Sequence, residues 1–217
     1  MLRKSRFFYW VIKLFANFAV KLSDVLQIDG LISYNRSQPT QKVSGQTTFK
    51  TKDTTSNLSE YLRIQTYNKP QTKFFLRAES FYNFSTEVQR LVEEDDYIAL
   101  YRSYGGNLHE CSHGESFLNL VKNRFTPNGL YVLDEPEAAL SPERQLSLLY
   151  LINELAEEGS QFIIATHSPI LISYRDGIIL DLNNNLKETK YEDTDIYQIY
   201  KMYLDDREGM QHRLFDD

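Results

Sequence analysis

The residues with the clearest chemical potential are two adjacent carboxylates, Asp134 and Glu135, which follow the apolar run 130–133. Turn-forming residues bound this run, as expected of a short strand buried on both faces. A buried carboxylate is costly unless a cation or hydrogen-bond donors meet it. Ligands of open α/β sheets bind outside the carboxyl ends of the strands, so the acid pair indicates a site for a metal ion and a phosphate. The dipeptide alone also fits a strand that leaves the core into a charged turn.

Two further polar groups accompany the acid pair. A second apolar run, residues 161–166, ends at His167, and the segment 112–115 (Ser-His-Gly-Glu) opens a stretch whose apolar residues recur at helical spacing. We therefore predict a helix that begins near Glu115. The start of a helix carries unpaired N–H donors and a partial positive charge, so it holds phosphate oxygens well, and Gly114 would let the backbone approach an anion closely.

These groups, in this order and spacing, resemble the motifs of ATP-binding-cassette (ABC) ATPases. Residues 112–115 resemble the signature motif, residues 130–135 the Walker B strand with its catalytic glutamate, residues 139–141 the D-loop, and His167 the switch histidine. The segments Glu-Pro-Glu-Ala-Ala-Leu-Ser-Pro and Ala-Thr-His-Ser-Pro resemble the sequences of the soluble "predicted ATPase" branch of AAA-family proteins rather than those of transporter subunits. The resemblance covers roughly residues 55–215.

The resemblance implies MgATP hydrolysis and a role for each motif residue. Asp134 would hold Mg²⁺, Glu135 would orient or deprotonate the attacking water, and His167 would reach the γ-phosphate. Nucleotide contacts are expected from the signature motif and the D-loop, at Ser112, Gly114, Glu115 and Ser141. In the resembled family the signature motif binds a nucleotide held by the opposite subunit, so we expect a homodimer or a complete ATPase partner at the signature face.

One part of the family pattern is missing. A phosphate-binding P-loop (Walker A) has the pattern Gly-x-x-x-x-Gly-Lys-Ser/Thr, and none of the nine glycines begins it. We therefore expect an α/β, three-layer domain of the P-loop-NTPase (ABC ATPase) type with a mostly parallel sheet, N-terminally incomplete, from a truncated copy. Residues 1–54 would form an atypical N-terminal helix, over residues 7–20, and a mobile loop. Residues 55–217 would form the ATPase-like domain.

The remaining elements must carry the motif residues to one place. We predict strands over residues 73–77 and 161–166, a hairpin of residues 177–182 and 186–191, and helices over residues 84–96 and 197–204. A further helix begins with Ser141 as N-cap and Pro142 in its first turn, and stops at Gly159.

Composition limits the setting. The hydrophobic content of 41% and charged content of 25% are those of a soluble globular protein, and a single cysteine fits a reducing, cytoplasmic compartment. The net charge of −6 argues against a generally basic nucleic-acid surface. Lys13 interrupts the N-terminal apolar run, which disfavours both a signal peptide and stable membrane insertion. That run fits a helix that covers the core, a poorly ordered terminus, or an amphipathic helix on a membrane surface.

Three functional hypotheses follow. The first is a MgATP-dependent ATPase with its signature motif acting in trans in a head-to-tail dimer. The second is a non-catalytic interaction protein, or pseudo-ATPase, that lends its signature motif to a complete ATPase partner. The third is a peripheral regulator associated with DNA or with a membrane. The negative net charge does not support the DNA alternative.

Overall fold

The computed structural model describes residues 9–12, 69–78, 81, 113–181 and 184–216. Six strands form one sheet in the order β2-β3-β4-β1-β5-β6. All neighbouring strands are parallel except β5 and β6, which are antiparallel. The strands are β1 (Tyr9–Ile12), β2 (Lys73–Arg77), β3 (Leu130–Asp134), β4 (Gln161–Thr166), β5 (Ile178–Asp181) and β6 (Lys187–Thr189). The predicted mixed α/β class with a mostly parallel sheet is confirmed.

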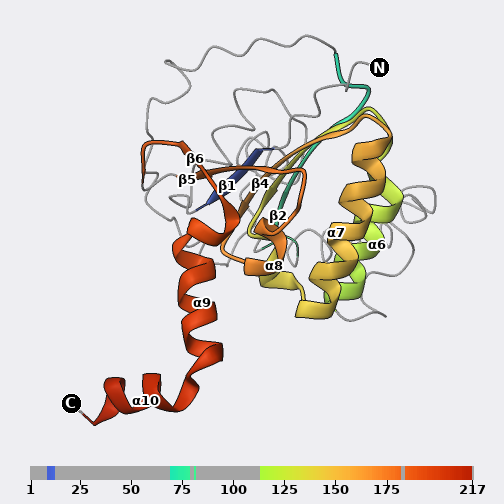
Figure 1. Ribbon diagram of the computed structural model, residues 1–217. Helices are drawn as coiled ribbons and strands as arrows, with labels where there is room; N and C mark the ends of the chain where they lie inside the picture. The colour runs from blue at the N-terminus through green and yellow to red at the C-terminus, as the bar shows by residue number, and fades with distance from the viewer. Residues whose placement is uncertain (1–8, 13–68, 79–80, 82–112, 182–183, 217) are drawn as a thin grey trace, which may run out of the picture.

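Two helices cover one face of the sheet. These are α6 (His113–Arg124) and α7 (Pro142–Glu157), which lie side by side in Figure 1. The main core lies between them and the sheet, and its fully buried members include Leu76, Phe117, Leu120, Tyr131, Leu133, Leu148, Ile152 and Phe162. Phe75 and Val132 alternate with these strand residues, point to the opposite face and are also buried. Both faces of the sheet are therefore shielded, as a three-layer domain requires.

The strand and helix predictions near the motifs are largely confirmed. β2 and β4 have the predicted bounds, and β3 extends the predicted run by one residue to Asp134. Helix α6 begins at His113, two residues before the predicted start. Helix α7 follows Ser141 at the N-cap position, and Gly159 (φ +92°) ends the segment in the left-handed region that glycine tolerates. The predicted helix over residues 84–96 lies outside the described residues.

The N-terminal helix prediction is wrong where it can be compared. Residues Tyr9–Ile12 form β1, which lies in the middle of the sheet and pairs with β4 on one side and β5 on the other. A short apolar run does not distinguish strand from helix by its periodicity. Aromatic and β-branched residues favour strands, and a central position provides hydrogen-bonding partners on both edges of the backbone. Tertiary pairing therefore decided the outcome.

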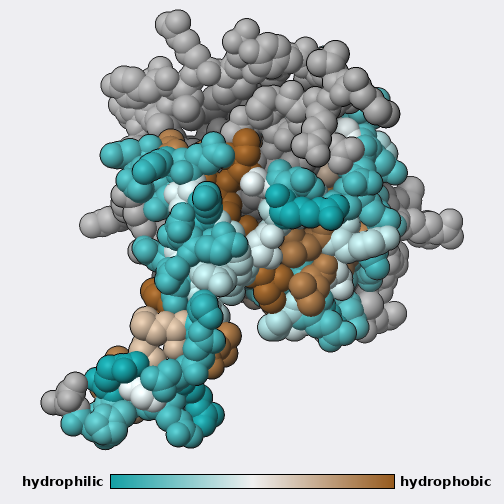
Figure 2. All heavy atoms as spheres, in the orientation of Figure 1, coloured by the Kyte–Doolittle hydropathy of each residue, from teal (hydrophilic) through white to brown (hydrophobic). Residues whose placement is uncertain are grey.

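The chain after the sheet leads away from the core. After the short helix α8 (Pro169–Ile172) and the hairpin β5–β6 comes the helix α9 (Asp195–Asp205), which replaces the predicted 197–204 with slightly wider bounds. A further helix, α10 (Arg207–Phe215), was not predicted, and it projects with the end of α9 beyond the body of the domain (Figure 1). Apolar side chains interrupt the hydrophilic surface of the projecting helices α9 and α10 (Figure 2). The exposed apolar residues of α9 include Ile199, Met202 and Leu204. Among the described residues, no helix combines the length and apolarity needed to cross a membrane.

The ring of Tyr131 is fully buried and stacks on Phe125, with centroids 4.0 Å apart. Its hydroxyl accepts a hydrogen bond from the Thr126 N–H (2.6 Å) and donates one to the Thr126 carbonyl (2.7 Å). The hydroxyl therefore holds the turn that leads into β3, at the end of the strand opposite the acid pair.

We expect Tyr131→Phe to lower the free energy of unfolding by about 1–2 kcal/mol, because the Thr126 N–H loses its acceptor inside the fold. Urea unfolding of the full chain measures the change. Tyr150→Phe is the matched control: it removes a hydroxyl that bonds Glu154 on the surface, and should change stability by less than about 0.5 kcal/mol. Equal effects of the two substitutions would show that the turn does not depend on the Tyr131 hydroxyl.

Candidate functional site

The acid pair lies at the carboxyl end of β3, where parallel register sets its neighbours. Asp134 is paired in register with Arg77 of β2 on one side and with Ala165 of β4 on the other. Its side chain is buried, and Oδ2 lies 3.4 Å from Arg77 Nε. The guanidinium offsets part of the cost of burying the carboxylate. Arg77 was not among the predicted site residues; the signal that could have found it is an arginine at the end of an apolar strand.

Glu135 faces outward, although it follows Asp134 directly. Its backbone is in the left-handed region (φ 48°, ψ 50°), and its N–H donates to the Ala165 carbonyl at 2.9 Å. A left-handed residue turns the chain sharply, so the chain leaves the edge of the sheet at Glu135. The Glu135 side chain is 38% exposed, compared with 5% for Asp134. Two adjacent acids thus occupy different environments.

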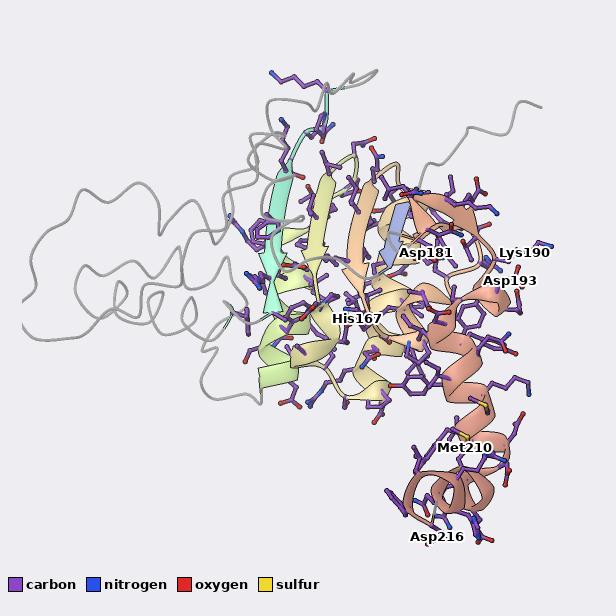
Figure 3. All side chains as sticks on the ribbon, turned by 90° about the vertical axis from the view of Figure 1, so that its left-hand side faces the viewer. His167, Asp181, Lys190, Asp193, Met210 and Asp216 are labelled. Atoms are coloured by element: carbon purple, nitrogen blue, oxygen red, sulfur yellow. The ribbon has the colours of Figure 1, made fainter. Side chains whose placement is uncertain are left out.

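His167 lies beside Glu135. It follows β4 by one residue, and its Nε2 is 3.9 Å from Glu135 Oε1. Figure 3 shows His167 just past the carboxyl ends of the strands. Its side chain is 45% exposed, so both groups can meet a ligand from solvent. The structure therefore brings together Glu135 and His167, next to the buried Asp134, as the sequence predicted.

Three of the residues predicted to contact nucleotide, Gly114, Glu115 and Ser141, lie at the starts of helices α6 and α7. Gly114 is buried at the start of α6, and an added Cβ would lie 2.8 Å from Arg144 Cδ and 3.0 Å from the Ala139 carbonyl oxygen. A Cβ at this position would therefore crowd the start of α7 and the end of the turn before it, and the contact of Gly114 with a nucleotide stays a prediction. Glu115 pairs with Arg144 across 3.0 Å. Ser112 lies outside the described residues.

Ser141 is exposed at the N-cap position of α7, but its side chain makes no capping hydrogen bond. Its hydroxyl is thus not used as a helix cap. Ser141 follows the short 3-10 helix η1 (Pro136–Ala139) and Leu140, in the segment that joins the acid pair to α7.

Asp134 is the residue expected to hold Mg²⁺, and its donor chemistry fits. Among the described residues, no group of three or more His, Cys, Asp or Glu side chains is placed to hold a metal ion. Mg²⁺ in phosphate sites is commonly bound by one or two carboxylates, with substrate oxygens and water completing its shell. A single buried carboxylate beside the exposed Glu135 is compatible with that mode.

A family model decides the resemblance. Residues 115–173 match the family described as "AAA domain, putative AbiEii toxin, Type IV TA system". This segment runs from the first turn of α6 to just beyond α8, and contains Asp134, Glu135 and His167. The family resemblance seen in the motifs is thereby confirmed for this segment: it is similar to an AAA-type ATPase domain.

Other comparisons add only distant likeness. Comparison with curated proteins gives no match. Among solved structures, the chain is similar to UvrA2 from Deinococcus radiodurans (25% identity, TM-score 0.28), with 45% of this chain and 14% of that chain covered. It is also similar to the SMC head domain from Thermotoga maritima (20% identity, TM-score 0.32), with 49% and 48% covered. The chain thus spans less than half the length of either structure.

We expect Arg77→Met to lower the free energy of unfolding by about 2 kcal/mol, because the buried Asp134 carboxylate loses its adjacent cation. Adding Asp134→Asn should restore much of the loss, since the remaining partner is then neutral. Denaturant unfolding of the single and double variants measures this coupling. Arg175→Met is the control, because its pair with Asp176 is exposed and should contribute little. Additive effects of Arg77→Met and Asp134→Asn would contradict the pairing.

Proposed function

We propose that this chain contributes to MgATP hydrolysis, with Glu135 and His167 acting on the attacking water and the terminal phosphate. The observation that supports this most directly is the 3.9 Å separation of Glu135 Oε1 and His167 Nε2 at the carboxyl edge of a parallel sheet, beside the buried Asp134. The match of residues 115–173 to an AAA domain supports the choice of nucleotide as substrate.

The roles follow from the environments of the three side chains. Glu135 is exposed and acceptor-only when ionised, so it can take a proton from a water molecule. His167 can donate an N–H to a phosphate oxygen from the neighbouring turn. Asp134 is fixed by its register with Arg77 and would hold Mg²⁺, which when bound neutralises phosphate charge.

The start of α6 bears on how two copies of the chain would assemble. Gly114 and Glu115 are at the start of α6, which packs on the start of α7 through Arg144. The Ala139 carbonyl near Gly114 belongs to the 3-10 helix that follows the acid pair, and Glu115 is exposed, which would allow it to meet a nucleotide held by a second copy. We propose a head-to-tail dimer in which each signature motif acts on the partner's nucleotide.

A non-catalytic role is the second candidate, and one sequence feature favours it. None of the nine glycines begins a P-loop pattern, so the amides that normally hold the β-phosphate have no counterpart of that kind in this sequence. In this case the chain would lend its signature motif to a complete ATPase.

Glu135→Gln should reduce ATP hydrolysis by the full chain roughly 10²–10⁴-fold, because an amide cannot accept the proton from water. Nucleotide affinity should change little, since the amide keeps the shape of the side chain. Phosphate release and MgATP binding measure the two quantities. Glu143→Gln is the matched control, an exposed acid in the first turn of α7. Turnover unaffected by Glu135→Gln would remove Glu135 from the reaction, and no MgATP binding would favour the non-catalytic role.

Mixing two inactive variants tests the dimer. A Glu135→Gln copy keeps its signature motif, and a Ser112→Arg copy keeps its glutamate. If the motif acts in trans, half of the randomly formed dimers contain one intact site of two, so activity should recover to roughly a quarter of wild type. A motif that acts within its own chain would give no recovery.

A further inference from the structure

A second carboxylate, Glu137, joins the two turns that carry Glu135 and His167. It lies in η1, two residues after Glu135. Its Oε1 accepts a hydrogen bond from the His167 backbone N–H at 2.6 Å, and its Oε2 accepts one from the Thr166 hydroxyl at 2.7 Å. One side chain from the turn after β3 thus binds two successive residues at the end of β4.

A carboxylate suits both contacts. Both oxygens of Glu137 act as acceptors, which an ionised carboxylate provides and an amide does not. Bonds to a charged acceptor are shorter and roughly twice as strong as neutral ones, in keeping with the two distances. Glu137 is therefore suited to holding the His167 backbone firmly.

Buried groups continue the connection. The Thr166 hydroxyl accepts from the Ser168 N–H (3.0 Å), and the Ser168 hydroxyl donates to Gln145 Oε1 (2.5 Å). The Gln145 amide in turn donates to the Leu140 carbonyl (3.1 Å), just past the end of η1. The path thus returns to the segment that carries Glu137, and the β4 turn is attached to the β3 turn at two points.

The local backbone needs this support. Glu135 is a non-glycine residue in the left-handed region, a conformation that costs roughly 1–2 kcal/mol and persists only where surrounding contacts impose it. Its own N–H is bonded to Ala165, and Glu137 fixes the chain two residues later. The side chains of Glu135 and His167 are not fixed by a hydrogen bond to each other, since Oε1 and Nε2 are 3.9 Å apart.

We infer that Glu137 is a positioning residue: its two carboxylate oxygens hold the His167 turn against the Glu135 turn and so set the distance between the imidazole and the Glu135 carboxylate. This inference rests on the proposed function for its catalytic consequence, but the positioning itself can be measured without turnover. Glu137 is distinct from Glu135, the proposed base, and from Asp134, which pairs with Arg77.

The test is a spectroscopic double-mutant cycle on the full chain. Four histidines are present, so the imidazole ¹H–¹³C signals of His167 can be assigned with His167→Gln. In the wild-type background, Glu135→Gln removes a charge 3.9 Å from Nε2 and should shift these signals. In a Glu137→Ala background the same substitution should shift them by about half as much or less, because the two side chains are no longer held together. An undiminished shift would overturn the inference.

Two further variants keep the result interpretable. Glu137→Gln retains the shape and one acceptor, so it should give an intermediate response, and it replaces Glu137→Ala if that variant does not fold. Glu143→Ala removes an exposed acid from the next helix and should leave the response to Glu135→Gln unchanged. A loss of response in Glu143→Ala as large as in Glu137→Ala would also overturn the inference, because the effect would then not be specific to the bridging carboxylate.

Kinetics separate this inference from the proposed function. Glu137→Ala should lower kcat about tenfold to hundredfold through misplacement of His167, and should cost nothing further in a His167→Gln background. If Glu135→Gln abolishes turnover while Glu137→Ala leaves it intact, the proposed function stands and the positioning role is overturned. If turnover responds to neither substitution, the proposed function fails, and the imidazole shifts alone decide the role of Glu137.

Discussion

The hydrogen bond from the Glu135 N–H to the Ala165 carbonyl carries the β3–β4 pairing one residue beyond the strand, and the site depends on this extension. It holds Glu135 against the sheet while its left-handed backbone turns the chain away. Asp134 consequently remains in register beside Arg77, inside the edge of the sheet, and Glu135 reaches solvent. Two chemically similar neighbours thereby acquire different possible roles, one as a buried anion and the other as an accessible base.

Around this edge, the buried polar groups support the exposed ones. Thr166, Ser168 and Gln145 are all buried and are hydrogen-bonded to one another or to the turn after β3. Burying such groups without partners would cost free energy, so a fully connected set favours one arrangement of the two turns over alternatives. The reactive side chains project from this scaffold and need few contacts of their own, which leaves them available to a ligand.

The sequence predicted what periodicity and motif spacing encode, and missed what only pairing decides. β2 and β4 were found with correct bounds because apolar runs end in charged or polar residues there. The Tyr9–Ile12 strand was missed because its partners lie far away in the chain. The pairing of Arg77 with Asp134 could not be predicted without the register of β2 and β3. The contacts of Glu137 could not be predicted without the direction of the 3-10 turn that carries it. Gln145 did leave a signal, as a polar residue three positions before Leu148 on the buried stripe of α7.

The place of β1 in the sheet has a consequence for how the chain acquires its structure during synthesis. Tyr9 pairs with Ile163 on one side and Ile178 on the other, so β1 can find its neighbours only after those distant residues have been synthesised. Until then β4 and β5 each present an open edge, a state prone to unwanted association with other chains. Such distant pairing slows folding, and both edges stay open until residue 178 has emerged.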